Sequence, residues 1–178
     1  MARDALRALS REMPNSRHRI QIIVETETES DRVAAILSAT MLEDALKEAI
    51  SQFMRPSLSD KDYSSAFDGM GFLSSFSAKI TAGYVFGLYG CHTRSDLNII
   101  KDIRNAFAHA SIPIDFNTDS IRNACAQLHV CSTISDCAFT PWPPVEPRQV
   151  YVRSSHYIAL HLQKYVEKRE VNENPHSP

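Results

Sequence analysis

Apolar side chains recur along most of this chain at intervals of three and four residues, the spacing of one face of an α-helix. The longest such stretch, residues 30–54, is apolar on two sides that lie roughly half a turn apart. The first side holds Val33, Ile36, Leu37, Thr40 and Met41, and the second holds Leu42, Leu46, Ala49, Ile50 and Phe53. A helix whose apolar side changes along its length packs between several neighbours. We therefore predict that residues 30–54 form a central, buried helix.

The same periodicity predicts the elements around this central helix. The expected helices span residues 2–12, a segment from Ser16, residues 72–88, 93–110 and 119–129, and a last helix from 147 or 148 to 169. A chain of 178 residues forms one compact domain by default. The sequence thus predicts an all-α, single-domain multi-helix bundle. The expected divisions are an N-terminal helical segment (1–28), the helical bundle domain (29–169) and a disordered tail (170–178).

Glycines and prolines mark the breaks between these helices. The stretch 55–71 reads as a loop in which Gly69 and Gly71 permit positive φ, and Gly90 is expected to end the helix that follows. Four of the seven residues from 141 to 147 are proline. A Pro-rich stretch is stiff and extended, so we expect a Pro-rich crossover before the last helix.

Composition and charge exclude several functional classes. The net charge of −2 gives no overall attraction to nucleic acid or to anionic membranes. No run of about 18 apolar residues exists, so no membrane span is expected. The first residues alternate charged and apolar types and lack the hydrophobic core of a signal peptide. We therefore expect a cytoplasmic protein.

The cysteines Cys125, Cys131 and Cys137 recur every six residues, with His129 between the first two. Closed zinc sites usually have pairs of ligands two to four residues apart, whereas these cysteines are six residues apart. We expect reduced, partly buried thiols, with no metal and no cofactor.

The most specific stretch of the sequence is residues 93–110, where Thr93 and Asp96 are placed to start a helix. Its apolar face consists of Leu97, Ile100, Arg104, Phe107 and Ala108. An unpaired guanidinium is costly to bury, so Arg104 must reach water at the edge of this face, meet a carboxylate on another helix, or face a cleft or a partner. His109 lies at the expected helix end, where a cationic imidazole suits the negative pole of the dipole.

The central helix carries the carboxylates that can meet this arginine. Asp44 and Glu43 lie on or beside its first apolar side, and either can form a structural ion pair with Arg104. Replacing Arg104 by Ala should then lower the stability by about 3–5 kcal/mol, because it leaves a buried carboxylate unpaired. Lys79, the one charged residue of the 72–88 helix, is expected at the surface, and the alternative is that it forms a second ion pair with Asp44.

Three segments together resemble the bacterial mannitol operon repressor family. They begin at Glu29 (ESDRVAAILSATMLEDAL), at Phe67 (FDGMGFLSSFSAKI) and at Asp96 (DLNIIKDIRNAFAH), and the resemblance covers roughly residues 29–110. It implies an all-α bundle that regulates sugar-alcohol operons through other proteins and without a DNA-binding motif of its own. We accordingly expect a non-catalytic transcriptional regulator or co-repressor, a homodimer whose protein partner the sequence does not identify.

The arginine and histidine also resemble the R-x4-H motif of the HEPN superfamily, which includes metal-independent ribonucleases that act as dimers. Under this alternative Arg104 would stabilise charge on the reacting phosphate, His109 would be the general acid or base, and Asn105 would assist. RNA is a partner only under this alternative. On an ideal helix the Arg104 and His109 side chains point roughly 140° apart, which counts against it.

Direct DNA binding is not expected from the residues themselves. A helix-turn-helix protein needs a recognition helix rich in Arg, Lys, Gln and Asn within a basic surface. Residues 119–129 contain Arg122, Asn123 and Gln127 but no lysine. A bundle that binds a small molecule is the third hypothesis, for which the sequence offers no candidate ligand.

Overall fold

The computed structural model describes residues 18, 21, 22, 24, 26, 28–55, 57–129 and 146–173, with side chains as far as residue 167. Six helices have defined bounds, and the described residues contain no strand. The helices are α3 (Asp31–Ser51), α4 (Asp60–Phe67), α5 (Phe76–Val85), α6 (Cys91–His109), α7 (Asp119–Cys125) and α9 (Pro147–Glu173). The all-α, single-domain helical bundle predicted from the sequence is confirmed. The expected helix at 2–12, Cys131, Cys137 and most of the Pro-rich crossover lie outside the described residues.

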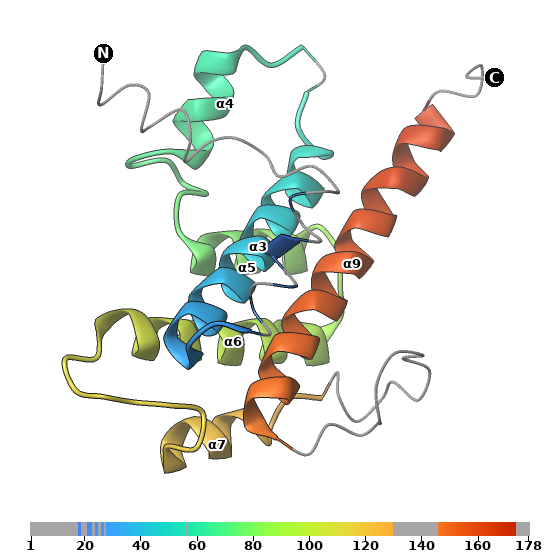
Figure 1. Cartoon of the computed structure of the whole chain (residues 1–178). Helices are drawn as coiled ribbons and strands as arrows, with labels where there is room; N and C mark the ends of the chain where they lie inside the picture. Colours follow the sequence, from blue (N-terminus) through green and yellow to red (C-terminus); the bar gives the residue numbers. More distant parts are fainter. Residues whose placement is uncertain are drawn as a thin grey trace.

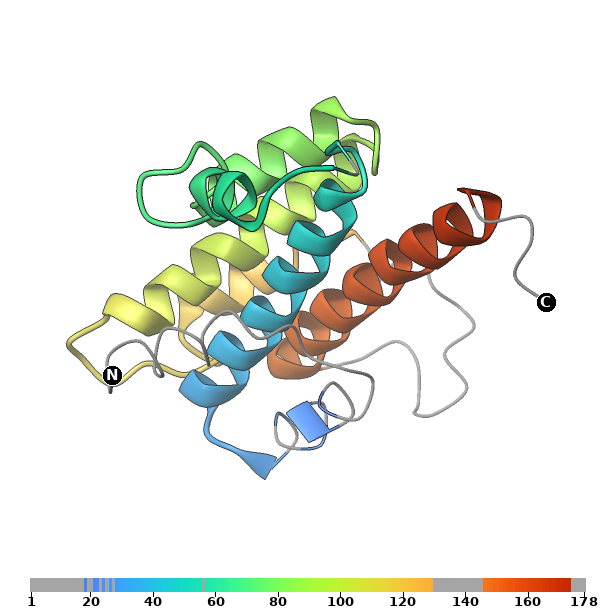
Figure 2. The same ribbon diagram turned by 90° about the horizontal axis from the view of Figure 1, so that it is seen from above.

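Helix α3 is the centre of the bundle, as predicted. It contacts α9, α6 and α5, and Figure 2 shows it between α9 on one side and α6 on the other. The Ser30 hydroxyl accepts a hydrogen bond from the Val33 amide and so caps the start of the helix. In Figure 1 α9 runs alongside α3, α6 crosses near the lower end of α3, and α7 lies below α6. Every other large helix is therefore organised around α3.

The first half of α3 uses a different side from the one that we predicted. Small residues face the core there, whereas Val33 and Thr40 are exposed. The buried small residues are Ala34, Ala35, Ser38 and Ala39. Small side chains allow a neighbouring helix to approach closely, and among the described helices α9 makes the most extensive contact with α3. The second predicted side is correct for Leu42, Leu46, Ala49 and Ile50, all of which are buried.

The region 55–71 contains a helix, α4, that we expected to be loop. Its start is a reciprocal cap, in which the Asp62 amide donates to the Ser59 hydroxyl and that hydroxyl donates to the Asp62 carboxylate. Gly69 has the predicted positive φ of 59°. Gly71 does not. A side chain at Gly71 would instead collide with the backbone carbonyl oxygens of Ala66 and Ser65.

The ends of the helices also differ from the predicted ones: α7, for example, ends at Cys125 and not at residue 129. Helix α5 is followed by Gly87, which has a φ of 73°, so Gly87 and not Gly90 provides the left-handed residue that follows a helix. Gly90 is instead the N-cap of α6. Helix α6 therefore begins at Cys91, two residues before the expected cap Thr93, and Asp96 lies inside the helix.

Helix α9 is joined to the start of α3 by a charged clasp. Arg148 contacts the Asp31 carboxylate at 2.8 Å and donates to the carbonyl oxygens of Thr26 and Glu29 at 2.8 and 2.6 Å. The second oxygen of Asp31 accepts a hydrogen bond from the Phe116 amide at 2.9 Å. This clasp brings together segments that are more than 80 residues apart in the sequence. The helix itself continues to Glu173, beyond the end expected at residue 169.

One turn after the clasp, Tyr151 is completely buried between three helices. Its hydroxyl lies 3.0 Å from the Ala35 carbonyl oxygen and 3.4 Å from that of Ile100, and burial raises the pKa of the phenol above its usual range. The ring packs against Phe116, which in turn packs against Phe107.

No helix in the described part of the chain is both long enough and apolar enough to cross a membrane.

Candidate functional site

Three helices meet at the carboxylate of Glu43. One of its oxygens lies 3.2 Å from the Arg104 guanidinium of α6, and the other lies 2.6 Å from the Lys79 ammonium of α5. Lys79 also donates to the Ser74 carbonyl oxygen at 3.2 Å. Both oxygens of Glu43 are therefore engaged by cations from two neighbouring helices.

The structure brings together part of the set that we predicted. Arg104 meets a carboxylate of α3 as expected, and that carboxylate belongs to Glu43 rather than to Asp44. The Arg104 side chain is 26% exposed, so it lies at the edge of the apolar face of α6 and not in the middle of the core. Lys79 was expected at the surface. It is buried instead, with 6% of its side chain exposed, because Glu43 and the Ser74 carbonyl receive its ammonium group.

A pocket of about 340 Å³ opens beside this ion-pair network. Nearly all of the side chains that line it are polar. They are Glu43, Ser74, Ser75, Phe76, Ser77, Lys101, Arg104 and Asn105. The Arg104 guanidinium lies 5.8 Å from the centre of the Phe76 ring. Two of the three residues of the HEPN-like alternative, Arg104 and Asn105, thus share one pocket.

The third residue of that alternative, His109, does not line this pocket. It is exposed and is the last residue of α6. The helix is continuous from Arg104 to His109, so the two side chains keep the angle of roughly 140° that an α-helix imposes. Within one copy of the chain, the arginine and the histidine do not converge.

Sequence reasoning missed a second polar cluster, around Asp96. This carboxylate is fully buried, and one of its oxygens lies 3.0 Å from the backbone nitrogen of His129 and 2.9 Å from its Nδ1. The His92 and His129 rings are 4.8 Å apart. The signal was present in the sequence, because helical spacing places Asp96 on the same face as Ile100, Ile103 and Phe107. The prediction placed Asp96 at the start of a helix and gave it no buried partner.

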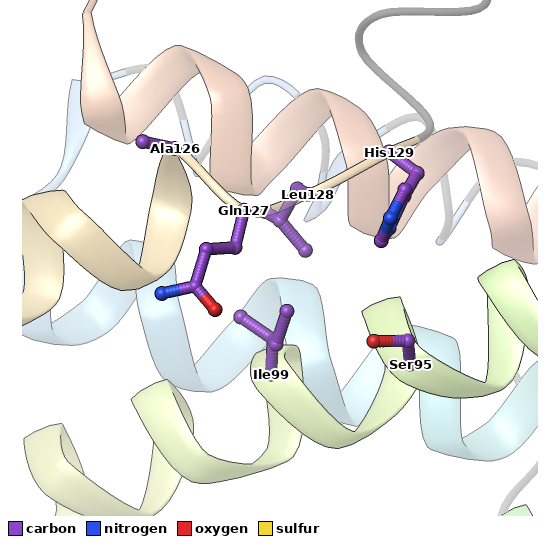
Figure 3. Close-up of a pocket in the computed structure, with 6 residues that line it drawn as sticks. All are labelled: Ser95, Ile99, Ala126, Gln127, Leu128 and His129. Atoms are coloured by element: carbon purple, nitrogen blue, oxygen red, sulfur yellow. The ribbon is translucent and has the colours of Figure 1, made fainter.

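A second pocket, of about 390 Å³, lies beside this cluster. Figure 3 shows Ser95 and Ile99 of α6 opposite Gln127, Leu128 and His129, which follow α7. Asp96 holds the end of the α7 segment against α6, and we assign this cluster a structural role.

Two further groups bear on the chemistry. His156 of α9 has its Nε2 fully enclosed without a hydrogen-bond partner among the described residues, and desolvation lowers its pKa to about 4. Cys125 is a buried cysteine that forms no disulfide with another described cysteine. In the described part of the chain no group of His, Cys, Asp and Glu is arranged to hold a metal ion.

The helices and their contacts define a mannitol repressor-like fold. The solved structure that shows this likeness is the X-ray structure of the MtlR–HPr complex from Escherichia coli. The match has 20% sequence identity and a TM-score of 0.53, and it covers 83% of this chain and 95% of the other. No family model matches the chain, and no curated protein matches it in sequence. At this level of identity the likeness establishes the fold.

Proposed function

We propose that this protein is a non-catalytic transcriptional regulator or co-repressor that acts through protein–protein contacts. The observation that carries the proposal is the mannitol repressor-like fold, since MtlR is a mannitol operon regulator and its structure was solved in complex with another protein, HPr. The three sequence segments that resemble the same family lie on α3, on the α4–α5 region and on α6. A partner of the HPr kind is therefore the first to test.

The surface supports a role in protein contacts. Met70 and Phe72 lie in the connection between α4 and α5 with 101% and 74% of their surface exposed. Large apolar side chains that are exposed close together are typical of interaction sites. The near-neutral net charge gives no comparable support for direct DNA binding.

Isothermal titration calorimetry of this chain with Escherichia coli HPr tests the proposal. We expect saturable binding with a dissociation constant on the order of micromolar, which the Phe72→Ser variant weakens. Lys61→Ser, an exposed change on α4, serves as the control. Absence of binding to HPr, together with binding of operator-like DNA by the purified chain, would contradict the proposal. Light scattering on the same sample measures whether the chain is the homodimer that we expect.

A metal-independent, HEPN-like ribonuclease is the second candidate, supported by the shared pocket of Arg104 and Asn105. It requires His109 to come from a second copy of the chain, because the two side chains diverge on α6. Under this alternative, RNA would be cleaved in EDTA by the wild type, and His109→Ala would abolish cleavage while leaving the melting temperature unchanged. We expect no cleavage by either protein. Cleavage lost in a folded His109→Ala variant would make this protein an enzyme.

A further inference from the structure

We propose that the pocket beside the Glu43 network binds a small phosphorylated molecule through its phosphate group. This inference goes beyond the regulatory role and does not depend on it. It rests on three observations about the pocket: the hydrogen-bond donors left over by its side chains, the balance of charge around it, and its size.

The first observation is that the pocket has more donors than the protein uses. Arg104 has five N–H groups, and its only described hydrogen-bond partner is one oxygen of Glu43. The Asn105 side chain lines the pocket and carries two further N–H donors. Ser75 accepts a bond from the Ala78 amide through its oxygen, which leaves its hydroxyl proton available. A ligand that fits these groups must mainly accept hydrogen bonds, as a phosphate does.

The second observation is the charge around the pocket. Arg104 and Lys79 share the single carboxylate of Glu43, so this network carries a net positive charge. Lys101 lines the same pocket, and its ammonium lies 3.3 Å from the Asp102 carboxylate and 3.4 Å from the Asn98 amide oxygen. Asp102 is largely exposed, and solvent weakens its effect on Lys101. Because Glu43 is already engaged by two cations, it opposes an anion less than a free carboxylate would.

The geometry of the donors favours phosphate among the possible anions. The planar guanidinium of arginine binds the oxygens of a phosphate or a carboxylate in pairs, and only the phosphate then has further oxygens for the other donors of the pocket. Ser75 and Ser77, at the start of α5, also line the pocket, and the helix dipole there adds to the attraction for a negative charge. A volume of about 340 Å³ is at the lower end of the range for small-molecule sites. It leaves room for a phosphate and a small organic group.

The test is an NMR titration of the ¹⁵N-labelled full chain with inorganic phosphate and with phenyl phosphate, against sodium chloride at equal ionic strength. We expect saturable shifts in the Ser75 and Ser77 amides and in the Arg104 guanidinium, and tighter binding of phenyl phosphate. Arg104→Gln and, independently, Lys101→Gln should each weaken binding about tenfold. Arg122→Gln removes an exposed arginine of α7 and should leave binding unchanged.

The opposite results would overturn the inference. Shifts that do not saturate, or that Arg122→Gln reduces as much as Arg104→Gln, would show non-specific attraction of anions. Benzoate binding as tightly as phenyl phosphate would make the site a carboxylate site. A phosphoserine peptide binding at least about tenfold tighter than phenyl phosphate would assign the pocket to a modified protein instead. If Arg104→Gln does not fold, Lys101→Gln decides the outcome, because the ammonium of Lys101 pairs with Asp102 and Asn98 and not with Glu43 among the described contacts.

Discussion

At the scale of single residues, Lys79 changes what Arg104 contributes to stability. The sequence suggested that Arg104 alone neutralises a buried carboxylate, so that its loss would cost about 3–5 kcal/mol. In the structure Glu43 is shared, and removing Arg104 leaves it with Lys79. Lys79 is the more deeply buried of the two cations. Breaking the Lys79–Glu43 pair should therefore cost more stability than breaking the Arg104–Glu43 pair.

We therefore expect two variants of this network to differ in stability. Glu43→Gln leaves the buried ammonium of Lys79 without a carboxylate and should lower the free energy of unfolding by about 3 kcal/mol. Arg104→Ala breaks a partly exposed pair and should lower it by about 1 kcal/mol. Urea denaturation measures both. The double variant Glu43→Gln, Lys79→Met removes the unpaired charge and should recover most of the loss. Equal losses from the two single variants would contradict this account.

The lowered pKa of His156 should make the free energy of unfolding depend on pH. Its pKa is about 4 in the folded protein and about 6.5 when the chain is unfolded, so below pH 6.5 the unfolded state binds a proton that the folded state does not. Stability is therefore fully present above about pH 6.5 and falls as the pH decreases towards 4. Between pH 7 and pH 5 the loss should be about 2 kcal/mol.

The matched control for this pH effect is His156→Leu. It removes the titrating ring together with an enclosed nitrogen that has no hydrogen-bond partner in the described part of the chain, so at pH 7 the variant should be at least as stable as the wild type. Urea denaturation at pH 7, 6 and 5 compares the two proteins, which share all other histidines. Parallel pH curves for the two would show that His156 is not responsible.

At the scale of elements, the long helices could be predicted from the sequence and their ends could not. Apolar periodicity identified α3, α6 and α9 because each buries a continuous face. Helix α4 was missed because it is short and lies among serines, aspartates and a proline. Its only clear signal was the Ser59–Asp62 capping pair. The boundaries of α5 and α6 were misplaced because three glycines follow one another closely, and only the backbone shows which one adopts positive φ.

The turn after α4 gives a prediction at this scale. Gly71→Ala should lower the free energy of unfolding by about 3 kcal/mol, because the added carbon would collide with backbone atoms that cannot rotate away. Gly90→Ala is the control, since its φ of −87° is ordinary and the space around it is open. It should cost less than about 1 kcal/mol. Thermal denaturation compares the two variants, and a Gly71→Ala protein as stable as Gly90→Ala would mean that the turn rearranges easily.

At the scale of the whole molecule, the sequence could predict that α3 is central but not which helix covers which side. The polar contacts that fix this arrangement join distant positions, such as Glu43 with Lys79 and Asp31 with Arg148. Local spacing contains no information about such pairs. For the same reason the sequence indicates Arg104 but not the Glu43 pocket, to which α3, α5 and α6 all contribute residues.

The packing of α9 on α3 also has a consequence for protein synthesis. A ribosome makes α3 well before α9, the helix that covers its alanine-rich side, because α9 begins only at Pro147 and the clasp needs Arg148. From the synthesis of α3 until that of α9, the nascent chain must therefore carry this side of its central helix uncovered. Folding can finish only when the last helix has left the exit tunnel. Until then, a chaperone that shields short apolar segments would have its natural target in residues 31–51.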